Sequence, residues 1–386
     1  MPTSKPRKKI KILHIIESLA SGGAEKLLTY SLKHVDKNKF SIKVVCLEPL
    51  LDLKKELENS GIPVICLNVR NLYHWYCAVP RLLLLIIKEK PDIVHTQLFF
   101  ANIYGRIASR IAGVRNIVTT LQNPDYTCEN NGKFTYIIRK FIDKYTGKFC
   151  NAAFIAVSDF VKKDFEKQLN FKNIRVLYNC VDSSVFGKHD SDADTKRTEL
   201  GFNKDDSVIL NIGRLHLQKG QMFLVEAFNL VYKNNNKCKL LIIGNGPLES
   251  VLKNRVKELN LEKNVIFLKN RQDVPDIMKI ADVFVFPSIY EGLPLALVEA
   301  MAGGLPVIAS KIDVLKEIVD DGIDGILVEN NDCVKFAETI SGLIGNQELK
   351  GYLSGNAREK AIRLFSPVEH VRKLENIYWE LTCGNN

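Results

Sequence analysis

The sequence predicts an α/β protein that contains two doubly wound units, each built on a parallel sheet. Short runs rich in β-branched residues alternate with helical stretches through the first half of the 386 residues. After a polar stretch the same alternation starts again and continues almost to the end of the chain. Such alternation favours parallel sheets with helices on both faces, and this length suits two domains of ordinary size.

The first predicted domain spans residues 1–183. Helical stretches, for example Ala24–His34 and Ala101–Ala112, lie between its strands. The strands are expected at Ile10–Ile16, Ser41–Leu47, Pro63–Leu67, Ile93–His95, Ile117–Leu121, Ala153–Val157 and Arg175–Tyr178.

Residues 184–206 are polar and lack a clear periodicity, which predicts a linker. A second domain is predicted over 207–366 and a final helix within 367–386. The strands of the second domain are expected at Val208–Ile212, Lys239–Ile243, Val265–Leu268, Val283–Phe286, Val307–Ala309 and Gly325–Val328. In such sheets ligands bind beyond the carboxyl ends of the strands, so a cleft between two facing units is the expected active site.

Composition indicates a soluble, intracellular protein. Hydrophobic residues make up 46% and charged residues 25% of the chain, which is ordinary for a globular protein. The longest strongly apolar run, Leu82–Ile87, is far too short to span a membrane. Nine cysteines, an odd number without a CxxC pair, predict a reduced cytoplasmic setting. The basic N-terminus precedes a strand interrupted by Lys11 and His14, which is typical of a tail rather than a signal peptide.

Charge is spread unevenly between the two halves. The net charge is +10, but residues 1–183 carry a balance of +13 and the remainder −3. This asymmetry predicts that the first half meets an anionic surface. Nucleic acid is disfavoured because no nucleic-acid-binding signature is present, so an anionic membrane leaflet or a phosphorylated lipid is expected.

Two basic helical stretches in the first half are the expected membrane contact. Apolar residues, including Tyr136, Ile137, Ile138 and Phe141, are interleaved in the second stretch. A solvated face over an ordinary core is the alternative. The basic residues are Arg106, Arg110, Arg115, Lys133, Arg139, Lys140, Lys144 and Lys148.

Two glutamates, Glu291 and Glu299, stand eight positions apart on either side of a Gly-Leu-Pro turn. Pro294 suits the first turn of a helix, because its missing N–H costs nothing there. The helix is expected over Leu295–Ala302 and ends at Gly303-Gly304. Free N–H groups at its start attract phosphate, and two flanking acceptors suit the hydroxyls of a nucleotide sugar.

In this setting the segment from Tyr290 to Met301 resembles the signature of the retaining glycosyltransferases of family 4, which is Glu, seven residues and Glu in an E-G-x-P context. The resemblance covers nearly the whole chain and implies the GT-B fold, in which two Rossmann-like domains face each other. It implies that 1–183 binds the acceptor at the membrane side and that 207–366 binds the nucleotide sugar. It also implies that the helix in 367–386, at Pro367–Leu381, crosses back to pack on the first domain.

The resemblance assigns the donor diphosphate to Arg214 and Lys219, in the segment G-R-x(4)-K-G. An Arg fork and a Lys charge converging on a diphosphate neutralise the leaving group. The implied donor-binding set is Gly22, Gly23, Gly213, Arg214, Lys219, Gly244, Gly246, Arg271, Val274, Glu291, Gly292, Leu293, Pro294, Leu295 and Glu299. The implied catalytic set is Glu291, Arg214, Lys219, Gln122 and His95.

Two strand ends depart from the family pattern. His95-Thr96-Gln97 and Thr120-Leu121-Gln122 carry glutamine where many relatives carry a second histidine. A glutamine amide donates a hydrogen bond but carries neither proton nor charge. For His95 both interpretations stay open: a functional residue or a histidine with satisfied partners at a strand end.

No metal and no cofactor is expected. The sequence Asp192-Ala193-Asp194 has the form D-x-D but lies in the polar linker, which favours solvated charge. No other cluster has metal-ligand spacing. Without a metal, Arg214, Lys219 and the helix N-terminus at 292–295 must meet the charge of the leaving group.

The sequence therefore predicts a metal-independent, retaining hexosyltransferase on the cytoplasmic face of a membrane, bound peripherally. The expected donor is a nucleotide-diphosphate hexose or N-acetylhexosamine, a UDP-sugar first and GDP-mannose next. The expected acceptor is a hydroxyl of a lipid-linked or polysaccharide glycan in cell-surface polysaccharide or lipopolysaccharide synthesis. The alternatives are a sugar-nucleotide 2-epimerase of the same architecture, or an inactive sugar-binding subunit, which Gln97 and Gln122 keep open.

Overall fold

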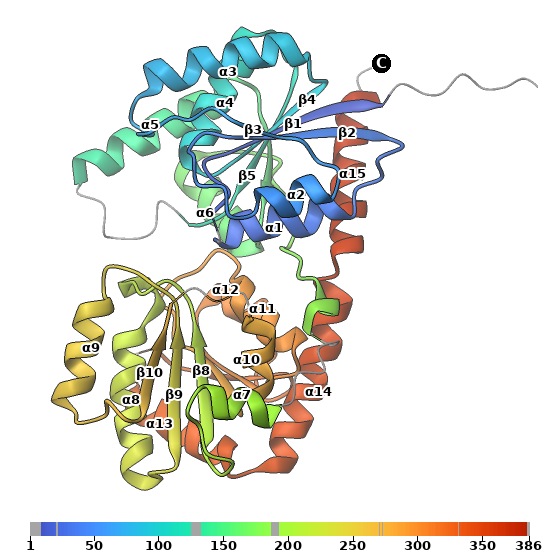
Figure 1. Cartoon of the computed structure of the whole chain (residues 1–386). Helices are drawn as coiled ribbons and strands as arrows, with labels where there is room; N and C mark the ends of the chain where they lie inside the picture. The colour runs from blue at the N-terminus through green and yellow to red at the C-terminus, as the bar shows by residue number, and fades with distance from the viewer. Residues whose placement is uncertain are drawn as a thin grey trace, which may run out of the picture. The chain divides into compact units, whose positions relative to one another are not determined.

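A computed structural model of the chain describes residues 9–20, 22–124, 133–186, 193–269, 271, 273–330 and 332–383 (Figure 1). These residues form two compact units. Unit 1 holds the described parts of Met1–Cys180 and Pro367–Asn386, and unit 2 those of Val181–Ser366. Each unit contains one parallel sheet, which confirms the predicted fold class.

The sheet of unit 1 has seven parallel strands in the order β3-β2-β1-β4-β5-β6-β7. Neighbouring residues of one strand serve opposite faces: Val44 joins one hydrophobic cluster and Val45 the other. Because both faces are covered, the strands are apolar almost throughout. Their bounds are β1 Ile10–Ile16, β2 Phe40–Cys46, β3 Val64–Cys66, β4 Ile93–Gln97, β5 Asn116–Leu121, β6 Ala153–Ala156 and β7 Arg175–Val176.

Helices cover both faces of this sheet (Figure 1). One face packs against α1 (Gly23–Lys33), α2 (Lys54–Asn59) and α15 (Pro367–Cys383). The other packs against α3 (Trp75–Glu89) and α4 (Phe99–Ile111), with α5 (Lys133–Phe149) beside α4. Helix α6 (Asp159–Leu169) contacts α5, β6 and β7.

The last helix returns to the first unit, as predicted. Val371, Leu374 and Tyr378 of α15 lie in the core shared with α1 and β1. His370 Nδ1 lies 2.8 Å from the carbonyl oxygen of Tyr178, and the Asp36 N–H donates to Glu375 Oε1 at 2.8 Å. Helix α15 is therefore a structural part of unit 1.

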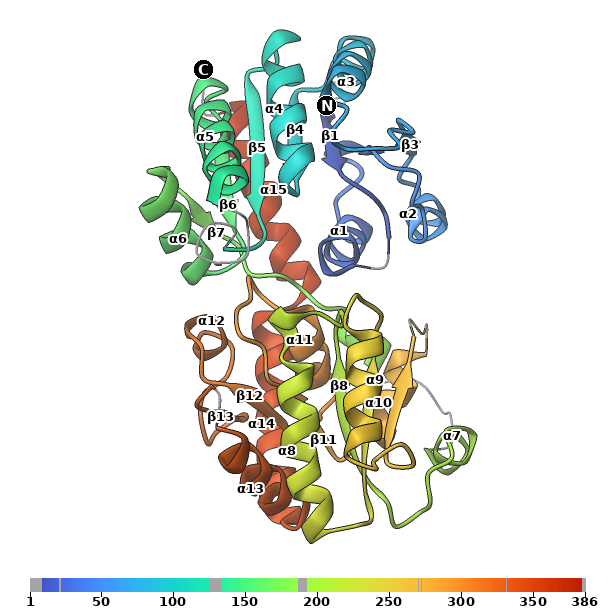
Figure 2. The same cartoon turned by 90° about the vertical axis from the view of Figure 1, so that its left-hand side faces the viewer.

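The sheet of unit 2 has six parallel strands in the order β10-β9-β8-β11-β12-β13. One face packs against α8 (Gln221–Asn234), α9 (Glu249–Glu258) and α13 (Cys333–Ile344) (Figure 2). Helix α11 (Leu295–Ala302) packs on α14 (Gln347–Leu364), and the short α12 covers Asp313–Lys316. The strands are β8 Ser207–Ile212, β9 Cys238–Ile243, β10 Val265–Leu268, β11 Val283–Phe286, β12 Val307–Ser310 and β13 Ile326–Val328.

The stretch interpreted as a linker contains structure of its own. A 3₁₀ turn covers Ser183–Phe186 and helix α7 covers Ala193–Glu199, while 187–192, including Asp192 of the D-x-D sequence, lie outside the described residues. Helix α7 packs on α10 (Val274–Ile280), and Arg197 donates to the carbonyl oxygen of Ile280 at 3.0 Å. No residue of α7 is fully buried. Its sequence therefore lacks the apolar stripe from which a helix is predicted.

Candidate functional site

The two charged motifs of unit 2 meet at one edge of its sheet. The strand order reverses between β8 and β11, which are hydrogen-bonded neighbours, and the segments that follow them leave the same edge. The Ile289 N–H donates to the carbonyl oxygen of Gln218 at 2.8 Å. Gln218 Nε2 donates to the carbonyl oxygen of Tyr290 at 2.9 Å. Segments 213–220 and 287–295 therefore form a single site.

An ion pair lies at the centre of this site. Lys219 Nζ is 2.6 Å from Glu291 Oε1, and the two side chains are 19% and 5% exposed. Lys219 Nζ also lies 5.3 Å from the centre of the Phe286 ring. A carboxylate buried this deeply needs a partner, and Lys219 is the partner that holds Glu291 in place.

Arg214 and His216 complete the charged surface of the segment. Arg214 is exposed, and within the described residues no hydrogen bond or ion pair holds its guanidinium. Burial, followed by the charges of Arg214 and Lys219, lowers the pKa of His216, so this ring stays neutral at pH 7. His216 Nδ1 accepts from the Gln218 N–H at 3.3 Å. Sequence reasoning passed over His216, although it lies between the two predicted cations.

The glycines of this edge are required by tight packing of the backbone. Gly244 has φ of +150°, and a Cβ there would collide with the carbonyl oxygen of Gly213. Gly220 has φ of +66° and lies equally close to the carbonyl oxygen of Pro287. Leu215 donates to the carbonyl oxygen of Asn245 at 2.9 Å, and a Cβ at Gly246 would collide with the Leu215 carbonyl. These glycines let three loops approach one another beside the ion pair.

Helix α11 begins directly after the turn that carries Glu291. Pro294 stands at its N-cap in extended conformation, and the first helical residue is Leu295. Gly292, Leu293 and Leu295 are buried. Glu299, in the second turn, is 3% exposed. The two glutamates therefore flank the N-terminus of a buried helix, as the motif predicted.

The side chain of Arg271 is held by neighbouring carboxylates. Its guanidinium donates to Asp273 Oδ1 at 2.7 Å and to Glu199 Oε1 at 3.0 Å. The hydrogen bonds from Arg271 hold the pKa of Asp273 well below its usual range. Val274, the first residue of α10, is buried, and Asn270 lies outside the described residues. In this structure Arg271 ties α10 to α7.

In unit 1 the corresponding edge lies at the ends of β1 and β4. Residue 21 lies outside the described residues, whereas Gly22 and Gly23 begin α1. A Cβ at Gly22 would collide with the buried carboxylate of Glu25, to which Ser18 Oγ donates at 3.2 Å. Burial raises the pKa of Glu25. Gly22 therefore makes room for a carboxylate of the helix that it caps.

Glu17 is a residue of this edge that sequence reasoning missed. It follows β1 directly, and its Oε1 accepts the N–H of Phe100, at the start of α4, at 2.6 Å. Burial raises the pKa of Glu17 to about 7, against the hydrogen bond from Phe100, which lowers it. An acidic residue directly after an apolar strand was the available signal.

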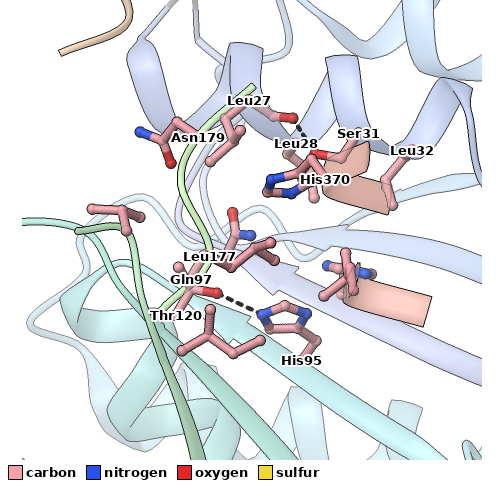
Figure 3. A pocket seen from close by; sticks show the side chains of 14 residues that line it. Leu27, Leu28, Ser31, Leu32, His95, Gln97, Thr120, Leu177, Asn179 and His370 are labelled. Carbon is pink, nitrogen blue, oxygen red and sulfur yellow. Dashed lines mark hydrogen bonds between the residues drawn. The ribbon is translucent and has the colours of Figure 1, made fainter. Parts of the chain in front are cut away.

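His95 lies in a buried polar cluster. Its Nδ1 is 2.6 Å from the Tyr378 hydroxyl. Its Nε2 is 2.7 Å from Thr120 Oγ1 (Figure 3). The Tyr378 hydroxyl is also 3.1 Å from Nε2 of His14. Burial lowers the pKa of His14 to about 3 and that of His95 well below its ordinary value. Both rings are neutral at pH 7, and the geometry supports the interpretation of His95 as a histidine with satisfied partners.

The two glutamines occupy strand ends with spare hydrogen-bonding capacity. A cavity of ≈ 20 Å³, lined by His14, His95, Gln97, Thr120 and His370, is large enough for about one water molecule (Figure 3). Among the described residues neither Gln97 Oε1 nor Gln122 Nε2 has a hydrogen-bond partner. Gln122 follows β5 directly and is half-buried, with its Nε2 among the buried atoms.

The described residues contain no group of three His, Cys, Asp or Glu side chains arranged to hold a metal ion. Within the same residues, every helix is too short or too polar to cross a membrane.

This fold and this site define a glycosyltransferase of the GT-B class. The family model described as "Glycosyl transferases group 1" matches residues 192–360, and that described as "Glycosyltransferase Family 4" matches residues 21–185. The chain belongs to this glycosyltransferase family, as the motifs predicted.

Individual relatives agree with this membership. The chain is 32% identical over 384 residues to the UDP-Gal:α-D-GlcNAc-diphosphoundecaprenol α-1,3-galactosyltransferase of Escherichia coli, covering 97% of this chain and 98% of the relative. It is 28% identical to the capsular polysaccharide biosynthesis glycosyltransferase CapM of Staphylococcus aureus, covering 77% and 79%. The crystal structure of Anabaena HepE in complex with UDP-glucose has the same fold, with a TM-score of 0.85, 23% identity and coverage of 96% and 99%.

Proposed function

We propose that this glycosyltransferase transfers a hexose from a UDP-sugar to a hydroxyl of a lipid-linked glycan, with retention at the anomeric carbon. The observation that carries the proposal is the Lys219–Glu291 pair beside the exposed Arg214, at the switch point of the sheet in unit 2. The E. coli relative, which is similar over nearly its whole length, supports both substrate classes, because it acts with UDP-Gal on a diphosphoundecaprenol-linked sugar.

Each charged residue has a role that its surroundings suit. Lys219 and Arg214 bind the diphosphate, and the N-terminus of α11 adds further N–H donors. Glu291, held by Lys219 at 2.6 Å, accepts hydroxyls of the transferred sugar. Glu299 accepts the ribose hydroxyls. The remaining predicted contacts of the donor are backbone or shape contacts in this proposal. They are at Gly22, Gly23, Gly213, Gly244, Gly246, Arg271, Val274, Gly292, Leu293, Pro294 and Leu295.

The proposed chemistry needs no metal and no protein nucleophile. The bond between the anomeric carbon and the leaving phosphate oxygen breaks, and the acceptor hydroxyl oxygen bonds to that carbon from the same face. The hydroxyl proton passes to the leaving phosphate oxygen. The protein contributes position and charge stabilisation. Gln122 orients the acceptor by a hydrogen bond, and His95 keeps the strand ends beside it in place.

The cellular setting follows from the acceptor. We place the protein on the cytoplasmic face of the membrane, bound peripherally and engaged in cell-surface polysaccharide or lipopolysaccharide synthesis. The capsule-synthesis relative supports this setting, as does the +13 balance of residues 1–183.

A transfer assay separates the proposal from its alternatives. The purified protein is incubated with UDP-Gal, UDP-Glc, UDP-GlcNAc or GDP-mannose, chelator, and a short-chain lipid diphosphate that carries N-acetylglucosamine. We expect one UDP-sugar to give a product one hexose larger, with the α linkage by NMR. Conversion of the donor to its 2-epimer without acceptor indicates an epimerase, and donor binding without any product indicates an inactive subunit. A strict requirement for a divalent cation contradicts the metal-free step.

A further inference from the structure

Helix α5 has its apolar side turned away from the protein. Its large hydrophobic side chains are 38–76% exposed, the extremes being Ile142 and Phe149. A helix that merely covered a core would show the opposite arrangement. The outward residues, named here the apolar face of α5, are Phe134, Ile137, Ile138, Phe141, Ile142, Tyr145 and Phe149.

Polar and small residues on the inward side fix this orientation. Asp143 is buried and forms an ion pair with Arg106 of α4, whose side chain is fully buried. Arg106 Nε also donates to the carbonyl oxygen of Asn102 at 3.0 Å. At Gly147 a Cβ would collide with the ring of Phe171. Turning the apolar face inward would leave Arg106 buried without its carboxylate, which is strongly unfavourable.

The rim of the apolar face is basic. Asp143 is the only acidic residue in 133–149, and it points inward. Lys144 is half-buried along the helix, Lys148 is exposed, and Arg139 lies 4.1 Å over the ring of Phe99. Lys140 is also half-buried, and its Nζ donates to Gln168 Oε1 at 2.7 Å. Two copies of this face would bring lysines together, whereas an anionic surface complements them.

Aromatic contacts extend the face to the start of α3. The ring of Phe99 is 5.3 Å from that of Phe100, which is 5.1 Å from that of Tyr73. Tyr73, Trp75 and Tyr76 are well exposed. Aromatic rings with a polar edge suit the boundary between lipid headgroups and acyl chains. Because α4 starts directly after β4, this band adjoins the sheet edge where the acceptor would bind.

We propose that the apolar face of α5, with Tyr73, Trp75 and Tyr76, inserts into the boundary between headgroups and acyl chains of an anionic membrane. Lys144 and Lys148 contact the lipid phosphates while the apolar side chains leave water. This inference rests on the proposed function, because a membrane contact of α5 would place the acceptor edge of unit 1 at the bilayer that holds a lipid-linked substrate.

Partition onto vesicles tests the proposal. Wild type and the double variant Ile137→Ser/Phe141→Ser are sedimented with phosphatidylcholine vesicles that contain phosphatidylglycerol. The loss of two apolar side chains from the lipid contact should lower the vesicle partition coefficient of the variant at least ~100-fold. The matched control, Val251→Ser/Val334→Ser, changes two exposed residues of unit 2 and should bind as wild type. Raising the salt should weaken wild-type binding without abolishing it, because only the charged part is screened.

Three results would overturn the proposal. They are equal partition of the wild type and the Ile137→Ser/Phe141→Ser variant, complete loss of wild-type binding in high salt, and a wild-type dimer in solution that the double variant dissociates. The last result would make α5 a self-association surface. Transfer to the short-chain acceptor in the absence of vesicles tests the proposed function independently, so failure of one proposal is distinguishable from failure of the other.

Trp75 supplies a second readout. The chain has two tryptophans, Trp75 and Trp379, and Trp379→Phe leaves Trp75 as the sole reporter. Its emission should shift to the blue and be quenched by brominated acyl chains when vesicles are added. Unchanged emission from a vesicle-bound protein would remove the α3 aromatics from the contact.

Discussion

The two units are built on the same plan, yet they use charge in different ways. Both sheets reverse strand order between adjacent strands, β1 and β4 in unit 1 and β8 and β11 in unit 2. At the edge of unit 2 the cations Arg214 and Lys219 are accessible or half-buried. At the edge of unit 1 the titratable groups are buried and neutral histidines or carboxylates with raised pKa values. One scaffold therefore carries two kinds of site, set by the loops.

The two units also differ in the role of their buried ion pairs. In unit 1 the ion pair between Arg106 and Asp143 holds a helix in place, whereas in unit 2 the pair between Lys219 and Glu291 lines the proposed donor site. Mutations at the two pairs should therefore have different consequences.

Arg106→Ala should destabilise unit 1 by ~3–5 kcal/mol, because it leaves Asp143 buried without its cation. Hydrogen exchange of the β-strand amides in unit 1 measures the loss. Arg255→Ala is the control: Arg255 pairs with Glu226 on the surface of unit 2, where solvent screens the pair, so its loss should cost much less. If the two variants lose equal stability, the Arg106 pair is not the anchor of α5.

Arg214→Ala and Lys219→Ala should each lower the turnover number at least ~tenfold, which corresponds to ~1.4 kcal/mol of lost charge stabilisation. Arg214 is exposed, so its replacement should leave the stability of unit 2 unchanged. Steady-state rates at saturating donor are compared with those of Lys253→Ala, whose side chain pairs with Glu249 at the surface. Wild-type turnover in Arg214→Ala would exclude this residue from the diphosphate site.

Glu299→Ala should weaken donor binding by roughly 1–3 kcal/mol, because the ribose hydroxyls lose their acceptor. Glu291→Ala should lower turnover more than it lowers donor affinity. Calorimetric titration with the nucleotide alone and with the nucleotide sugar separates the two effects. The assignment fails if both variants bind donor and turn over as the wild type does.

Acid should destabilise unit 1 before unit 2. The folded-state pKa of His14 is lowered to about 3 and that of His370 to about 4, both by burial. A histidine with a lowered pKa contributes stability above its unfolded value near 6.5, and this contribution is lost as the pH falls below it. Glu17, with its pKa raised to about 7, acts in the opposite direction. Protection factors, which correct for the slower intrinsic exchange in acid, should fall in unit 1 first between pH 7 and 5, and His370→Gln should reduce that slope. Equal slopes in both units would contradict the burial of these rings.

The sequence by itself determined the strands, the helices with a buried stripe and the positions of both charged motifs. Every predicted strand is present within one or two residues, because strands covered on both faces leave an unbroken apolar run. The motif at Glu291 and Glu299 was equally local, since it combines a turn, a proline and a helix start. Helix α7 was not predicted, because none of its side chains is fully buried and its short sequence therefore lacks an apolar stripe.

Only the tertiary structure decided which partners these residues have. Lys219 and Glu291 are 72 positions apart, and nothing local predicts that they pair. The sequence around His95 is compatible with a functional or a structural role. The structure favours the structural role, because the hydroxyl of Tyr378, 283 positions away, contacts one of its ring nitrogens. An amphipathic sequence pattern is the same whether the apolar side of the helix faces a protein core or lipid. For α5 the buried ion pair of Arg106 and Asp143 shows which side of the helix faces the protein. Local periodicity records the shape of an element, whereas long-range contacts decide which of its faces is buried.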